Sequence, residues 1–166
     1  MDKLNPPTSH GVFKPVGHVV ISFPGADDQR GAAEALRALG LEDTALVHYT
    51  PEEMQRQARA DVERADDLAA IGQDLNLVQA QLTLAEHGYH FLVVKAGDDE
   101  MARRIADTVK PFNAERAQLY GRFIIEELIE HPDDEPQVAE SPDRGLDAQT
   151  PSGLESERVW RHRDGR

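Results

Sequence analysis

The segments HVVISFPGADDQ at residues 18–29 and FLVVKAGDDE at residues 91–100 follow one plan, and this plan decides the fold. Each starts with β-branched and aliphatic residues, which favour a strand, and then reaches a glycine and two aspartates before a helix-like run. Another strand-like segment follows each helix, so the chain is organised as two βαβ halves. Two right-handed crossovers predict an α/β (α+β) fold of the ferredoxin-like kind, with a four-stranded sheet covered by helices on one face.

Local signals give the limits of these elements. The strands are predicted at residues 18–23, 45–49, 89–96 and 116–125. The last of these also fits a helix, but Gly121 interrupts a helix, and a fourth strand completes the second half. Asp27 or Asp28 is expected to cap the first helix, and Thr50 with Glu53 has the spacing of a reciprocal helix cap.

A helical insertion at residues 51–87, between the second and third strands, is apolar on two sides. Its second helix carries a first apolar stripe at steps of three and four, namely Leu68, Ile71, Leu75, Val78, Leu82 and Ala85. A second stripe, formed by Ala70, Leu77 and Leu84, lies about 200° further round the helix. Such a helix usually has two neighbours, of which one can be the domain's own sheet. The other is either a second copy of the chain, with the second stripe as an oligomer interface, or the helix at 51–64 folded back over it.

Length, charge and composition bound the class of protein. A chain of 166 residues suggests one domain, predicted at residues 17–130 after an extended arm at residues 1–16, which Val12 and Phe13 can pin to it. The net charge of −13 argues against nucleic acid and anionic membrane surfaces as partners. The chain has no cysteine and no apolar run long enough to cross a membrane, so we expect a cytoplasmic protein.

Residues 131–166 are rich in proline, glycine, serine and acidic residues, and this composition predicts a disordered acidic tail. We expect the tail to be dispensable for folding. Trp160 lies in a basic context and is a candidate docking motif for a protein partner, although such a tail end is more often inert.

Sequence motifs for nucleotide, cofactor or metal chemistry are missing. The chain has no Walker loop, no G-x-G-x-x-G, no G-x-S-x-G elbow and no H-E-x-x-H. Gly25 and Gly97 stand alone after their strands, and the aspartates that follow would repel a phosphate at those helix starts. A helix end separates His87 from His90, which disfavours a shared metal. We therefore expect no cofactor and no metal.

Alternation along the strands sorts their side chains onto two faces of the sheet. The helix-covered face is predicted to hold Val19, Ile21, Phe23, Leu119 and Phe123. The opposite face is predicted to carry Ser22, His48, His90 (or Tyr89), Tyr120 and Arg122. This set suits a carboxylate or phosphate, with Arg122 as its anchor. The competing interpretation, which we favour, is that the face is an oligomer interface or is covered by the inserted helices.

The first part of the domain resembles small bacterial general stress proteins of the heat-induced kind. The resemblance lies in the strand at residues 19–23, the Ala-Ala-Glu-Ala-Leu helix at 32–36 and the return at 40–47. It covers about a third of the chain, which departs from that family's usual glycine-rich and lysine-rich pattern. The resemblance implies a non-enzymatic, stress-related bacterial protein, and it brings no catalytic residues with it.

Three classes of function follow from these observations. The first is a non-catalytic, homo-oligomeric interaction protein of the stress response. The second is a small-molecule sensor that binds an anion on the predicted sheet face. The third is a cofactor-free enzyme of the dimeric ferredoxin-like kind, with His48 or His90 as the base.

Overall fold

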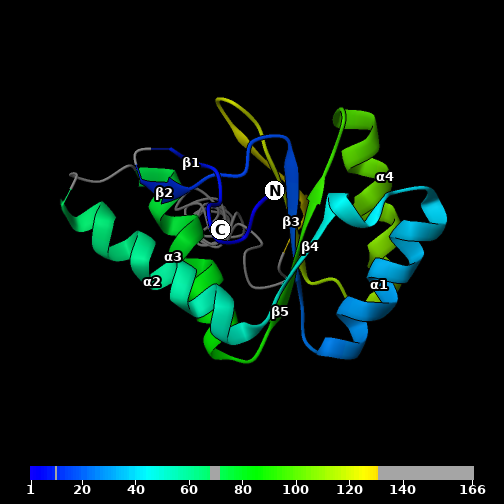
Figure 1. The fold of residues 1–166 in the computed structure, drawn as a ribbon, viewed down its shortest axis with the longest axis horizontal. Coiled ribbons are helices and arrows are strands. Elements are labelled where there is room, and N and C mark those ends of the chain that lie inside the picture. Colours follow the sequence, from blue (N-terminus) through cyan, green and yellow to red (C-terminus); the bar gives the residue numbers. More distant parts are fainter. Residues whose placement is uncertain (10, 68–71, 131–166) are drawn as a thin grey trace, which may run out of the picture. The chain divides into compact units, whose positions relative to one another are not determined.

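A computed structural model describes residues 1–9, 11–67 and 72–130, with side chains at all of these except 65–67 and 72–74. Within these ranges the fold is mixed α+β, as predicted, with four α-helices, a five-stranded antiparallel sheet and a small two-stranded sheet (Figure 1). The predicted tail at 131–166, with Trp160, lies outside the described residues, and so does Ala70.

The large sheet has the strand order β4 (Leu46–Tyr49), β5 (His90–Lys95), β3 (His18–Phe23), β6 (Arg116–Tyr120), β7 (Ile125–Ile129). All neighbouring strands are antiparallel. The central strands β3 and β5 pair along their full length, from His18 opposite Lys95 to Phe23 opposite His90. Both strands are almost continuously apolar because both faces of the sheet are covered.

The prediction of a single strand over residues 116–125 is wrong beyond Tyr120. The chain turns at residues 121–124 and returns as β7, and the Gly121 amide donates to the Ile124 carbonyl across the turn at 2.9 Å. The glycine that we interpreted as a helix breaker therefore makes a hairpin. As a result, Phe123 is 86% exposed instead of lying in the core, whereas Leu119 is buried there as predicted.

Replacing Gly121 with alanine should destabilise the protein by about 1–3 kcal/mol, the usual cost of forcing an atom into occupied space. A Cβ at this position would lie 2.5 Å from the Ile124 carbonyl oxygen, which is backbone and cannot rotate away. Gly97→Ala is the matched control, because a Cβ there would meet no atom within 4 Å beyond its own chain neighbours. Urea denaturation of both variants measures the difference. Equal stability of the two variants would contradict the described turn.

Helices α1 (Ala26–Leu39) and α4 (Asp99–Val109) cover one face of the sheet (Figure 1). Val19, Ile21 and Phe23 point into this core, as the alternation predicted, and all three are fully buried. Leu36 of α1 and Ile105 of α4 pack against them. Two short 3₁₀ helices, η1 (Asp43–Ala45) and η2 (Lys110–Phe112), precede β4 and β6.

Helix starts follow the predicted capping chemistry with one exception. Thr50 and Glu53 form the reciprocal cap of α2 (Pro51–Asp67), with hydrogen bonds of 3.2 and 2.9 Å. Asp98 caps α4 by accepting from the Met101 amide at 2.7 Å. The cap of α1 is Gly25, not Asp27 or Asp28 as predicted.

The second face of the sheet is covered by the insertion and the N-terminal arm. Helices α2 and α3 (Gly72–Glu86) pack against each other and against the small sheet of β1 (Thr8–Ser9) and β2 (Val12–Phe13). The face that we considered as a ligand site is therefore closed by the inserted helices, which was the competing interpretation. Leu77 is only 8% exposed, and Leu84 packs on the sheet. The second stripe thus needs no further copy of the chain to cover these two residues.

Candidate functional site

The five residues predicted to share one sheet face do not converge. Ser22 and Tyr120 lie on the face covered by α2 and α3, and each is 2% exposed. His48 alternates with Tyr49, whose side chain faces α2, so it lies on the α1 side of the edge strand β4. His90 pairs with Phe23, which also faces α1. Arg122 lies in the exposed hairpin turn with its guanidinium 5.5 Å from the Phe123 ring centre.

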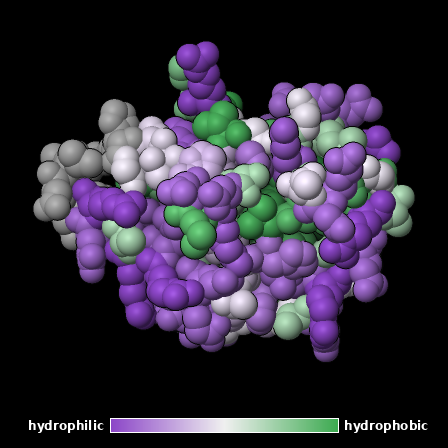
Figure 2. Space-filling model, in the orientation of Figure 1, coloured by the Kyte–Doolittle hydropathy of each residue, from purple (hydrophilic) through white to green (hydrophobic). Residues whose placement is uncertain are grey.

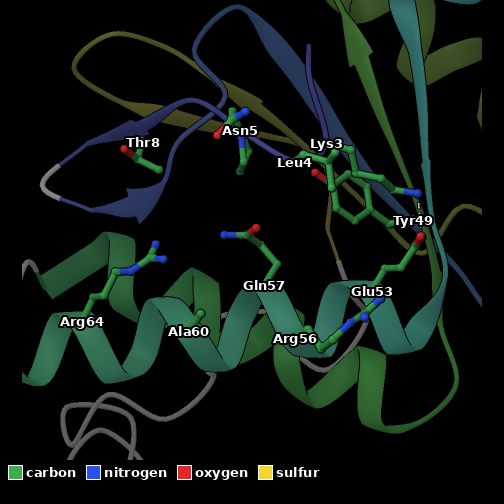
Figure 3. A pocket seen from close by; sticks show the side chains of 11 residues that line it. Lys3, Leu4, Asn5, Thr8, Tyr49, Glu53, Arg56, Gln57, Ala60 and Arg64 are labelled. Atoms are coloured by element: carbon green, nitrogen blue, oxygen red, sulfur yellow. Dashed lines mark ion pairs between the residues drawn. The ribbon is translucent and has the colours of Figure 1, made fainter.

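A different site lies between the N-terminal arm and α2. The two segments enclose a cleft of about 490 Å³, with Tyr49 at one end. Figure 3 shows Lys3, Asn5 and Thr8 of the arm lying across from the helix residues Glu53, Arg56, Gln57 and Arg64. The volume is that of a pocket for a small molecule.

The arm is held along α2 by polar contacts and by one aromatic side chain. The buried Asp61 carboxylate accepts from the Phe13 amide at 3.2 Å and from Gln57 Nε2 at 3.0 Å. Arg64 Nη1 donates to the Gly11 carbonyl at 3.1 Å. The Phe13 ring packs edge-on against Tyr49 and Tyr120, with 6.3 Å between ring centres in both pairs. These contacts build the cleft from segments about fifty residues apart.

The cleft is cationic in a protein whose net charge is −13. Its lining carries Lys3, Arg56 and Arg64 against the single carboxylate of Glu53. Lys3 Nζ pairs with that carboxylate at 2.7 Å, and Arg64 lies 3.7 Å from Asp61. Arg56 forms no ion pair within 4.0 Å among the described residues, but its charge acts on the nearby Glu53 carboxylate. Hydrophilic side chains dominate the face seen in Figure 2, and apolar side chains gather near its centre.

Tyr49 adds a hydrogen-bond donor to the end of the cleft. Its side chain is 2% exposed, and its hydroxyl has no hydrogen-bond partner among the described residues. Burial, reinforced by the carboxylates of Glu53, Asp61 and Asp2, raises the pKa of the Tyr49 hydroxyl to about 12. The group stays protonated at neutral pH, and leaving it buried without a partner costs free energy.

The lining holds hydrogen-bond donors and cations but few groups that could act as a general acid or base. Among the lining residues that the structure describes there is no histidine, and the one carboxylate is already paired with Lys3. No group of three or more histidine and acidic side chains within the described ranges is arranged to hold a metal ion. None of the described helices is long and apolar enough to span a membrane. The arrangement suits recognition of an anion.

None of the cleft residues was predicted to be a site residue, although the sequence carries one signal. Glu53, Arg56, Ala60 and Arg64 recur at steps of three and four, which places them on one face of α2. This face of α2 lies against the N-terminal arm but carries three charged residues, whereas a helix face that packs against another segment is usually apolar. The partner segment at residues 3–8 has no periodic pattern, so the sequence alone does not place it against the helix.

Comparison of the chain with protein-family models, with curated proteins and with solved structures finds no match. The resemblance of residues 19–47 to heat-induced general stress proteins therefore stays a prediction.

Proposed function

We propose that this protein is a non-catalytic sensor domain of ferredoxin-like topology that binds a small organic anion in the cleft between its N-terminal arm and α2. The topology is supported by the strand order β4-β5-β3-β6 and by the placement of α1 and α4 on one face. In this proposal β7 is an added edge strand, and α2 with α3 is an insertion that supplies the binding surface. The stress-related role that the resemblance implies is part of the same proposal, as is the cytoplasmic location expected from the composition.

One observation carries the proposed ligand class. Three cations, one carboxylate and a buried hydroxyl without a partner among the described residues line a single cleft of about 490 Å³. Arginine recognises carboxylate and phosphate through paired N–H donors, and the Tyr49 hydroxyl adds a further donor at the end of the cleft. A compact molecule with two or more acidic groups, such as a tricarboxylate or a phosphate ester, matches this set of donors.

The test is a screen for thermal stabilisation with citrate, ATP and inorganic phosphate as probes. A ligand at 100 times its dissociation constant adds about 2.7 kcal/mol to the free energy of unfolding. We expect citrate or ATP to raise the melting temperature, and we expect Arg56→Gln and Tyr49→Phe to reduce that shift by at least half.

Arg104→Gln is the control, because this exposed arginine lies on α4, on the far side of the sheet, and the substitution makes the same change in net charge. It should leave the shift unaltered. Equal loss in Arg104→Gln and Arg56→Gln would show a general effect of charge and would overturn the proposed site. The absence of any shift with all three probes would overturn the ligand class.

A further inference from the structure

A buried carboxylate lies directly behind the lining of the anion cleft. Asp61 is 1% exposed and is not itself a lining residue. Its Oδ1 atom accepts from Gln57 Nε2 at 3.0 Å and lies 3.7 Å from Arg64 Nη1. Both of these partners line the cleft, and Figure 3 shows their side chains extending from α2 toward the arm. Two of the donors that would face a bound anion are therefore shared with Asp61, which the proposed function does not use.

A bound anion and the ionised Asp61 carboxylate would compete for these donors. An anion that accepts from Gln57 or Arg64 comes within about 6 Å of the carboxylate, because each hydrogen bond spans about 3 Å. Two like charges at that distance in a partly buried site weaken binding by about tenfold or more. Protonation of Asp61 removes the repulsion and leaves the charge of Arg64 to the anion.

The charge of Asp61 changes within the range of pH in which the protein can be studied. Desolvation raises the pKa of Asp61 to about 6, against the hydrogen bonds from Phe13 and Gln57 and the charge of Arg64, which lower it. Asp61 is also the one charged residue among the described ranges that is fully buried. Its protonation state therefore depends on what approaches its two lining partners.

The elements packed around Asp61 carry further charged groups, namely the Met1 amino group, Asp2, Lys3 and Lys14 on the arm, Glu53, Arg56, Arg59, Glu63 and Arg64 on α2, and Glu86 on α3. Glu53 is the acidic group that lines the cleft itself. Burial raises its pKa, but hydrogen bonds with Lys3 and with the Thr50 amide lower the pKa overall. Glu53 thus stays ionised where Asp61 titrates, and its titration cannot stand in for that of Asp61.

We propose that the cleft binds its organic anion together with one proton, which the Asp61 carboxylate takes up from solvent as the anion enters. This inference rests on the proposed function and adds the regulation of the same site. The protein then holds the anion more tightly in mild acid and releases it as the pH rises. By linkage, the anion raises the proton affinity of Asp61 by the same factor by which the proton raises the affinity for the anion.

Calorimetric titration of citrate and ATP into wild type and Asp61→Asn, at about pH 5 and about pH 7.5, tests this coupling on both sides of the Asp61 pKa. Both anions lose a proton in this range, but they do so identically for the two proteins, so the ratio of dissociation constants isolates Asp61. We expect similar constants at the lower pH. At the higher pH we expect the wild type to bind about tenfold more weakly than Asp61→Asn.

Asp99→Asn is the matched control, because Asp99 is exposed on α4, on the far side of the sheet, and the substitution makes the same change in net charge. It should follow the wild type at both pH values. A ratio for Asp61→Asn that does not change with pH would overturn the coupling and leave the anion site in place, with His10, outside the described residues, as another source of pH dependence. No binding of citrate or ATP by either protein would overturn the proposed function and this inference with it.

An observation on the wild type covers the case in which Asp61→Asn does not fold. The ¹³C NMR signal of the Asp61 side-chain carboxyl carbon gives the midpoint of its titration, with and without saturating citrate or ATP. The midpoint should rise by about one pH unit when the anion is bound, which is the reciprocal of a tenfold effect on affinity. A midpoint that the bound anion leaves unchanged would overturn the coupling.

Discussion

Replacing Phe13 with alanine is expected to destabilise the protein by about 3–5 kcal/mol, the range found when a large buried aromatic side chain is removed. Phe13 is 2% exposed and belongs to the hydrophobic cluster that Tyr49, Phe91 and Tyr120 form under α2 and α3. Its loss removes two edge-on aromatic contacts and leaves a cavity between the arm and the sheet. Denaturation in urea, followed by circular dichroism, measures the change.

Leu4→Ala is the control for this experiment, because Leu4 lies in the same arm and is 89% exposed. Its effect should stay within about 0.5 kcal/mol, as for other surface substitutions. A loss of under about 1 kcal/mol for Phe13→Ala would mean that the arm does not dock, and one wall of the cleft would then be missing. The prediction thus concerns the binding site as well as stability.

The second large effect concerns pH and the buried carboxylate of Asp61. Desolvation raises the pKa of Asp61 from 3.8 to about 6, against the hydrogen bonds from Phe13 and Gln57 that lower it. A carboxyl group whose pKa is higher in the folded state binds more protons there than in the unfolded chain. Its contribution to stability therefore falls as the pH rises from 3.8 to about 6, and it is constant at higher pH.

Asp61→Asn should be more stable than the wild type at neutral pH, by up to about 3 kcal/mol, because the buried charge is removed. The new amide oxygen can still accept from the Phe13 amide, and the hydrogen bond with Gln57 is kept only if the Gln57 side-chain amide turns over. The difference in unfolding free energy between variant and wild type should grow as the pH rises from 3.8 to about 6 and then level off. Asp61→Ala is the contrasting variant, since it leaves the Phe13 amide without its acceptor and should be destabilised at every pH. A stability difference for Asp61→Asn that does not vary with pH would contradict the raised pKa.

Local patterns were sufficient for much of the fold. Period-two alternation placed Val19, Ile21 and Phe23 in the α1 and α4 core, and the Thr50–Glu53 pair marked the start of α2 correctly. These features depend on neighbours in sequence, where steric and hydrogen-bonding preferences act directly. The hairpin at residues 121–124 was missed because Leu119, Gly121, Phe123 and Ile125 continue the alternation of a strand through the turn.

The candidate site was not predictable to the same extent, because its two walls are far apart in sequence. Lys3 meets Glu53 and Tyr49 only when the arm packs along α2, which depends on the buried contacts of Phe13 and Asp61. Such packing between distant segments produces no periodic pattern of apolar residues in the arm, so its sequence does not predict the contact. Ser22 and Tyr120 were correctly predicted to share the sheet face that α2 and α3 cover. The prediction was wrong for His48 and His90, which lie on the α1 side, because the register between strands cannot be read from one strand alone.

The central claim is that the cleft between the arm and α2 binds an organic anion, and amide chemical-shift mapping by NMR tests it most directly. Citrate titrated into ¹⁵N-labelled protein should shift the amides of residues 3–8, Tyr49 and residues 53–64, and the shifts should saturate with one binding constant. The same titration of Arg56→Gln should give weaker binding at the same amides. Saturating shifts confined to another surface, such as the hairpin turn around Arg122, or no shifts at all with citrate and ATP, would contradict the account.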